Sequence, residues 1–274
     1  MRPFFCLLLL ALALSFGGCA QPSRTLTDAA PAAADLDSLP RVAGILSADL
    51  VLEGALVLAD DLLVPAGVTL VLRPGTRVYV VPSESTKIEP EWLSSATELL
   101  VRGTLRSEGT AEQPVVFEPL SSSAGTVYAW AGLLLDGATD SLIRHTRIQN
   151  AEQGVLCINS SPEIRDSRIL SCRYGITAQQ QSSPTLVGNL LQGGEAGVFC
   201  WNESHPLIQD NHIVGHNEEG LFIDRGSRPR LLGNRITGNG IGLALYDPGL
   251  AGAADQVRGN RQDLRLLGLP GGRP

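Results

Sequence analysis

Carboxylates are the first residues in this chain that could do chemistry, because it carries 28 aspartate and glutamate residues. Hydrolysis of a glycosidic bond usually requires two carboxyl groups about 5 to 10 Å apart. Glu203 and Asp224 fall on neighbouring copies of a sequence repeat, whereas Asp136 and Asp224 are four copies apart, roughly 19 Å at about 4.8 Å per copy. One neighbouring pair among so many acids does not identify an active site. The catalytic residues therefore stay unknown, and an enzyme is not favoured.

Histidine and cysteine do not indicate a metal site or a redox site. His205, His212 and His216 fall in one copy of the repeat but at different corners, so their spacing does not make them converge as ligands. Cys157 and Cys200 occupy the same position two copies apart, roughly 9.6 Å, which is too far for a disulfide. They are expected to be small buried hydrophobes. We expect no metal and no cofactor.

Aromatic residues point to binding. Four of the 13 aromatic residues follow the glycines of nearby repeats by two or four positions, which face outward on a strand. Exposed aromatic patches mark binding surfaces, and rings pack against the apolar faces of sugars while polar neighbours contact the edges. The candidate ligand-binding face consists of Phe199, Trp201, Glu203, Phe222, Asp224 and Tyr246. The alternative is that a loop, the 82–98 insertion or a second subunit covers this patch.

A glycine-led strand that returns about every 22 residues must position these side chains. The glycines that begin it are Gly154, Gly175, Gly197, Gly220 and Gly242. Prolines return with the same period, at Pro162, Pro184, Pro206 and Pro229. Short aliphatic runs with corners of glycine, asparagine and proline predict three short strands per coil of a stacked repeat protein.

Two polar columns accompany the aliphatic ones. Asparagine tolerates left-handed corners, and stacked amides can bond from coil to coil, so one column is expected to be structural. This asparagine ladder is expected to comprise Asn189, Asn211, Asn234 and Asn260. One position after it, a basic column contains Arg147, Arg168, His212 and Arg235. The basic column is expected to be a solvated face or a contact for an acidic glycan or headgroup.

With these columns, residues 45 to 267 resemble the right-handed parallel β-helix repeat family of the pectate-lyase-like superfamily. The resemblance implies the fold and makes carbohydrate the first ligand to suspect, because enzymes of that superfamily use a strand face as a saccharide groove. The polygalacturonase motifs Asn-Thr-Asp, Gly-His-Gly and Arg-Ile-Lys are absent. Copper-handling β-helix proteins of the periplasm are a further relative, but Met1 is the single methionine, which leaves little for soft-metal ligation.

The first forty residues indicate export. One arginine, an apolar run and Gly17-Gly18 predict a signal peptide over 1–18. Cys19 then resembles the lipidated cysteine of bacterial lipoproteins, although Phe16 departs from their usual aliphatic residue. Residues 19–40 are expected to form a flexible tether, followed by one β-helix domain over 41–274 with an inserted loop near 82–98.

The sequence as a whole predicts an all-β, right-handed parallel β-helix of about ten coils of roughly 22 residues. We expect a lipid-anchored cell-envelope protein, in the outer membrane or else periplasmic or secreted. Its expected partner is a polysaccharide or an envelope protein, without catalysis. A net charge of −7 argues against nucleic acid. A polysaccharide lyase or glycoside hydrolase with an unrecognised active site, and a purely structural assembly protein, are the alternatives.

Overall fold

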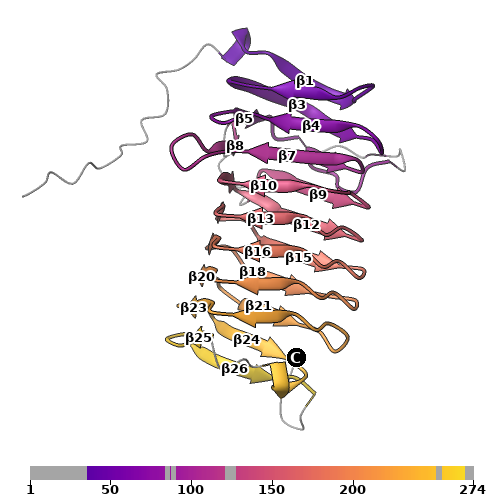
Figure 1. Ribbon diagram of the computed structural model, residues 1–274. Helices are drawn as coiled ribbons and strands as arrows, with labels where there is room; N and C mark the ends of the chain where they lie inside the picture. The colour runs from indigo at the N-terminus through magenta and orange to yellow at the C-terminus, as the bar shows by residue number, and fades with distance from the viewer. Residues whose placement is uncertain (1–35, 84–86, 88–90, 121–127, 251–254, 269–274) are drawn as a thin grey trace, which may run out of the picture. The chain divides into compact units, whose positions relative to one another are not determined.

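The protein is a stack of short parallel strands, as a computed structural model shows (Figure 1). The structure describes residues 36–83, 87, 91–120, 128–250 and 255–268. The predicted signal peptide, Cys19 and most of the tether lie outside these residues. Residues 37–274 belong to one compact unit. No helix within the described ranges is long and apolar enough to cross a membrane.

Each complete coil contributes three strands, which we name in chain order the proline strand, the middle strand and the glycine strand. The proline strands form an eight-stranded sheet: β2 (Leu50–Leu52), β4 (Thr69–Leu72), β7 (Thr104–Glu108), β10 (Leu142–Arg144), β13 (Glu163–Arg165), β16 (Thr185–Val187), β19 (Leu207–Gln209) and β22 (Arg230–Leu232). The middle strands are β5 (Arg77–Val80), β8 (Val115–Pro119), β11 (Thr146–Gln149), β14 (Arg168–Leu170), β17 (Leu190–Gln192), β20 (His212–Val214), β23 (Arg235–Thr237) and β25 (Gln256–Val257).

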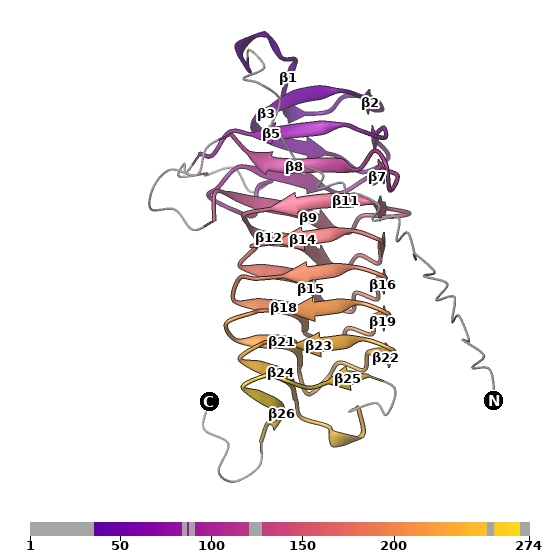
Figure 2. The same cartoon turned by 90° about the vertical axis from the view of Figure 1, so that its left-hand side faces the viewer.

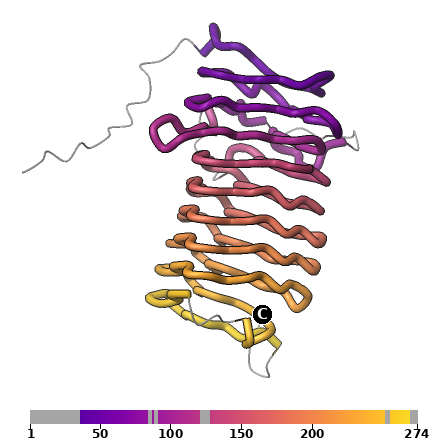
Figure 3. Tube along the Cα trace, viewed as in Figure 1, coloured from indigo at the N-terminus to yellow at the C-terminus, as the bar shows by residue number. Residues whose placement is uncertain are grey.

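The glycine strands complete each coil and share an 18-stranded sheet with the middle strands. They are β6 (Glu98–Val101), β9 (Trp130–Asp136), β12 (Ala151–Ile158), β15 (Tyr174–Gln179), β18 (Ala196–Cys200), β21 (Glu219–Ile223), β24 (Ile241–Leu245) and β26 (Gln262–Leu266). The first coils also contain β1 (Arg41–Ile45) and β3 (Ala55–Val64), and two short 3₁₀ helices occur at η1 (Leu36–Ser38) and η2 (Pro248–Leu250). The tube in Figure 3 shows the rungs that these strands form.

The strand pairings are parallel and in step with the sequence repeat, which confirms the predicted β-helix. In the proline strands, Ile143 pairs with Ile164, and Ile164 pairs with Leu186. These three residues come from successive coils and are fully buried, so one aliphatic column runs along the interior. A single coil could not bury this face, and stacking therefore supplies the core.

One detail of the predicted fold differs from the structure, because the stack has about nine coils and not ten. In the last middle strand, β25, Val257 pairs with Ile236 of β23. The insertion near 82–98 begins after β5, and its described residues contain no helix. Strand β6 starts within it, at Glu98.

Candidate functional site

The glycine of each glycine strand sits where the backbone of the next coil comes closest. A Cβ added to Gly175 would lie 2.4 Å from the carbonyl oxygen of Gly197 and 2.9 Å from a methyl carbon of Leu191 in the core. The added Cβ would therefore point inward, and the residue after the glycine is also buried, as Ile176 shows. Two consecutive inward positions interrupt the alternation of the strand.

Beyond the glycine the strands alternate as expected. The first and third residues after Gly197, Val198 and Cys200, are fully buried, whereas Phe199 is half-buried and Trp201 is exposed. The outward side chains of the glycine strands form a face that we call the aromatic face. Of the residues that the sequence singled out as a ligand-binding surface, Phe199 and Phe222 lie on this face. The other four follow the strand ends: Trp201, Asp224 and Tyr246 directly, and Glu203 in the corner beyond.

Four rings pack together on the aromatic face across three coils. The ring centroid of Phe199 lies 5.3 Å from those of Tyr174 and Phe222, and 5.9 Å from that of Trp201. The ring centroids of Trp201 and Phe222 are 5.2 Å apart. Trp201 is 41% exposed, so the cluster presents a large ring to solvent. We call Tyr174, Phe199, Trp201 and Phe222 the aromatic cluster.

Tyr174 is the member of the cluster that the sequence pattern did not single out. It directly precedes Gly175, a position that strict alternation would turn toward the core. Because the glycine interrupts the alternation, Tyr174 faces outward and packs against Phe199 at an interplanar angle of 79°. The repeated glycine was the signal in the sequence that could have predicted the outward direction of Tyr174. To use it, one must know that the glycine position itself faces inward.

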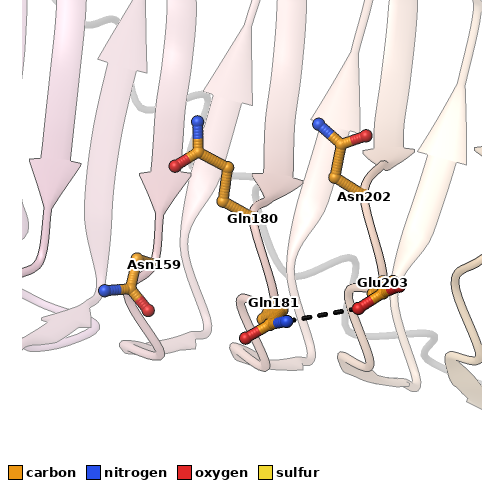
Figure 4. A pocket seen from close by; sticks show the side chains of 5 residues that line it. All are labelled: Asn159, Gln180, Gln181, Asn202 and Glu203. Atoms are coloured by element: carbon orange, nitrogen blue, oxygen red, sulfur yellow. Dashed lines mark hydrogen bonds between the residues drawn. The ribbon is translucent and has the colours of Figure 1, made fainter.

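A polar hollow of about 480 Å³ lies at the corner that follows the glycine strands (Figure 4). Its lining residues all have backbone φ angles between +47° and +64°, the left-handed region that asparagine adopts more readily than most residues. They are Asn159, Gln180, Gln181, Asn202 and Glu203. Gln181 donates a hydrogen bond from Nε2 to Glu203 across the coils, at 3.2 Å. Asn202 and Glu203 directly follow Trp201, so the hollow adjoins the aromatic cluster.

Asp224 and Tyr246, the two remaining residues of the predicted ligand-binding face, contact groups outside the aromatic cluster. Asp224 accepts backbone hydrogen bonds from Asn202 on one oxygen, at 2.7 Å, and from Ser227 on the other, at 2.8 Å. This carboxylate therefore shapes the corner of its coil. Tyr246 packs against the guanidinium of Arg225, with 5.4 Å between the guanidinium carbon and the ring centroid.

The described residues of the 82–98 insertion cover the N-terminal end of the aromatic face. Trp92 and Ala96 pack against the outward side chains of Leu63, Leu100 and Leu134. These contacts lie on earlier coils than the patch of Phe199, Trp201 and Phe222, whose cover by the insertion was the alternative left open by the sequence. In the part of the chain that the structure describes, this apolar packing ends at Leu156, one coil before Tyr174.

A buried ion pair holds the insertion in place. Lys87 donates from Nζ to Asp61 at 2.7 Å and to the carbonyl of Ala96 at 2.8 Å, and it lies 3.8 Å from Glu98. Burial raises the pKa of Glu98, although the backbone N–H of Leu93 and the charge of Lys87 act in the opposite direction. These groups anchor the insertion and leave the aromatic cluster untouched.

The predicted asparagine ladder exists as two ladders. Asn189 donates from its backbone N–H and its Nδ2 to Oδ1 of Asn211, both at 2.9 Å, and Asn211 bonds to Asn234 in the same way at 3.0 Å. The next acceptor is Asp255 and not Asn260. Asn260 lies in a second column, which contains His216, Asn239, Asn260 and Asp263.

The corner after the glycine strands has a ladder of its own, made of serine. Ser160 donates its backbone N–H to Oγ of Ser182, and Ser204 donates in the same way to Ser227, both at 3.1 Å. All four are buried. The spacing of these serines, which is 22 or 23 residues, was the signal in the sequence that could have predicted this ladder.

The histidines and cysteines that the structure describes do not form a metal centre. No group of three or more histidine, cysteine, aspartate or glutamate side chains in the described residues is placed to hold a metal ion. Burial raises the pKa of the Cys157 thiol to about 12 and also raises that of Cys200. His205 accepts the backbone N–H of Arg228 at 3.2 Å, and His216 is buried in the second ladder.

Two solved structures are similar to this chain. One is a mutant of the periplasmic alginate epimerase AlgG, which is 10% identical with a TM-score of 0.36 over 72% of this chain and 55% of that one, so this chain spans about half the length of AlgG. The other is the A-module of the mannuronan C-5 epimerase AlgE4 of Azotobacter vinelandii, which is 12% identical with a TM-score of 0.34 over 74% and 72% of the two chains. No functional conclusion follows from likenesses of this size.

Sequence comparison identifies the family. No curated protein matches the chain. The family described as periplasmic copper-binding protein (NosD) matches residues 103–250, which is more than half of the chain and spans the regular coils from β10 to β24. The parallel β-helix agrees with this match, and the chain belongs to the NosD family of periplasmic proteins.

Proposed function

We propose that this protein is a non-catalytic envelope protein that binds a polysaccharide through the aromatic cluster and the polar hollow. A lipid on Cys19 would hold it to the outer membrane. The observation that carries the proposal is the position of Trp201, which is 41% exposed and supported by Phe199 and Phe222 on its own and the next coil. A rigid, exposed ring of this kind offers a flat apolar surface to the apolar face of a sugar.

The composition of the hollow also supports a saccharide. Four of its five side chains are amides, which both donate and accept hydrogen bonds and so match sugar hydroxyls. Gln180 and Asn202 lie side by side on successive coils in Figure 4, while Gln181 and Glu203 form a second row below them. The rows repeat from coil to coil, and therefore present similar groups to successive units of a chain.

The absence of catalysis is proposed from the state of the nearest acids. Both oxygens of Asp224 accept hydrogen bonds from backbone N–H groups, so this carboxylate is already committed to the corner. Glu203 is held by Gln181. Glycoside hydrolysis requires two carboxyl groups that contact the substrate or the attacking water, and in this pair both Glu203 and Asp224 already have partners within the protein.

Copper binding is the property in the family's description, and the described side chains do not fit it. Copper prefers sulfur and imidazole ligands, and the thiols of Cys157 and Cys200 are fully buried with raised pKa values. The described histidines do not converge. We therefore assign no copper step to these residues.

A glycan array with the wild-type chain tests the proposal, together with the Trp201→Ala/Phe222→Ala double variant. We expect binding to a neutral or weakly charged polysaccharide, no unsaturated or shortened products, and a loss of affinity of about tenfold or more in the double variant. Tyr246→Ala is the matched control, because Tyr246 is exposed but packs with Arg225 outside the cluster. Equal losses in both variants, or appearance of cleavage products, would contradict the proposal.

The lipid anchor is tested separately. Cys19→Ser is expected to abolish labelling by fatty acid and to release the protein from the membrane fraction. Labelling or membrane association that survives the substitution would exclude lipidation at Cys19.

A further inference from the structure

The middle strands carry a second functional candidate on their outer side, which we call the basic face (Figure 2). Its central column is in register from coil to coil: Arg147 pairs with Arg168, Leu190 with His212, and His212 with Arg235. Arg168 pairs in turn with Leu190, so the column is continuous over five coils. Its two exposed arginines are Arg168 and Arg235.

The basic face has no acid among its outward strand positions. Isoleucine or leucine fills the inward position of each strand, as Ile148, Ile169 and Leu191 show, so the residues on either side of them face outward. The second outward column is uncharged and consists of Gln149, Leu170, Gln192, Val214 and Thr237. A chain with seven more acids than bases thus keeps one face of five coils free of carboxylates on its strands.

The exposed arginines are not committed to partners in the described structure. Neither Arg168 nor Arg235 makes an ion pair or a side-chain hydrogen bond with another described residue, whereas Arg165 on the next face pairs with Glu163. Burial and the charge of Arg235 lower the pKa of His212, which agrees with crowding of positive groups along the column. The two guanidinium groups are therefore available to an anion from outside the chain.

We propose that the basic face binds a linear anionic polysaccharide lengthwise along the helix axis. The two exposed arginines share one column three coils apart, roughly 14 Å at about 4.8 Å per coil, and Arg147 lies one coil before Arg168. These cations therefore form a line and not a plane. A polymer of uronic acids carries one carboxylate on each sugar and can follow such a line. Arginine suits this task because its planar guanidinium binds carboxylates with two parallel hydrogen bonds. This surface is separate from the aromatic cluster and does not depend on the function proposed for it.

Binding of the full chain to polygalacturonate at low ionic strength tests the proposal, with dextran as the uncharged polymer and phosphatidylglycerol vesicles as the anionic surface. We expect the wild type to bind polygalacturonate and to lose affinity as salt is added, whereas any binding to dextran should change neither with salt nor with the arginine substitutions. Arg168→Gln/Arg235→Gln should weaken binding about tenfold or more, because two charge contacts are lost. Arg144→Gln/Arg230→Gln is the matched control: it removes the same charge from exposed positions on the proline strands, and should change affinity less than about twofold.

Three outcomes distinguish this site from the aromatic cluster, from a general charge effect and from a membrane contact. Unchanged polygalacturonate binding in Trp201→Ala/Phe222→Ala would support a site away from the aromatic cluster. An equal loss in the control double variant would show a general charge effect and overturn the proposal. Binding to the vesicles without binding to polygalacturonate would assign the face to a membrane surface and also overturn it, as would failure of the wild type to bind either.

Discussion

Removal of the Asn211 side chain is predicted to destabilise the stack strongly, because this amide joins three coils. Its Oδ1 accepts the backbone N–H and the Nδ2 of Asn189, and its Nδ2 donates to Oδ1 of Asn234 and to the carbonyl of Leu186 at 2.9 Å. Asn211 is almost fully buried. In Asn211→Ala, the N–H of Asn189 and the carbonyl of Leu186 lose these partners away from solvent.

The magnitude follows from those two orphaned groups. A buried donor or acceptor left unsatisfied costs about 1 to 3 kcal/mol, so Asn211→Ala should lower the free energy of unfolding by about 2 to 6 kcal/mol. Asn211→Asp keeps the Oδ1 acceptor but replaces the Nδ2 donor with an oxygen that faces two acceptors. It should be no more stable than the alanine variant, despite its similar shape.

Equilibrium unfolding in urea measures this difference. Asn217→Ala is the matched control, since Asn217 is an exposed asparagine in the same coil, and a change within about 0.5 kcal/mol is expected there. Asp255→Asn should also be nearly neutral, because Asp255 ends the ladder and uses Oδ1 to accept from Asn234. A loss below about 1 kcal/mol for Asn211→Ala, or a loss equal to that of Asn217→Ala, would refute the reasoning.

Two further predictions concern the same coils. Burial lowers the pKa of His216 from 6.5 to about 4. Between these pH values the unfolded chain binds a proton that the folded chain excludes, so the free energy of unfolding should fall by about 3 kcal/mol as the pH drops from about 6.5 to about 4. His216→Asn, which copies the next residue of its ladder, Asn239, should remove this part of the pH dependence in unfolding curves measured at about pH 7 and about pH 4. Gly197→Ala should lower the free energy of unfolding, measured in urea, by at least about 1 to 3 kcal/mol, because the new Cβ would lie 2.4 Å from the carbonyl oxygen of Gly220. Gly226→Ala is the control and should be mild, because the nearest atom to its Cβ belongs to a flexible side chain 3.3 Å away. Similar unfolding midpoints for the two variants would contradict the clash.

The fold was accessible from the sequence because each structural column repeats one residue type at one spacing. Glycine, proline and aliphatic residues recur every 21 to 23 residues, and the strands pair in that register. The assignment of Asn260 to the ladder of Asn234 was wrong because these two residues are 26 positions apart. Asp255 follows Asn234 by 21 residues and Asn260 follows Asn239 by 21, and the hydrogen bonds of the two ladders follow this spacing.

The candidate site was less accessible, because it depends on exceptions to the repeat. The outward direction of Phe199, Trp201 and Phe222 followed from alternation, but that of Tyr174 did not, since Gly175 turns inward beside it. The sequence also could not show that backbone N–H groups donate hydrogen bonds to the carboxylate of Asp224. An aspartate that is exposed on a strand and one that is bonded at a corner cannot be told apart by residue type.

The ladders explain why few positions in this protein are available for a ligand-binding site. The asparagine, serine and aspartate side chains of the ladders form hydrogen bonds from coil to coil, and the side chains at the inward strand positions form the core. Only outward strand positions and the residues that protrude at the corners can vary without loss of the stack. The two features that the fold leaves unexplained, the aromatic cluster and the line of arginines, both lie at such outward positions on different faces. A ligand on one face would therefore leave the other free, and the same rigid coils could hold two polymers at once.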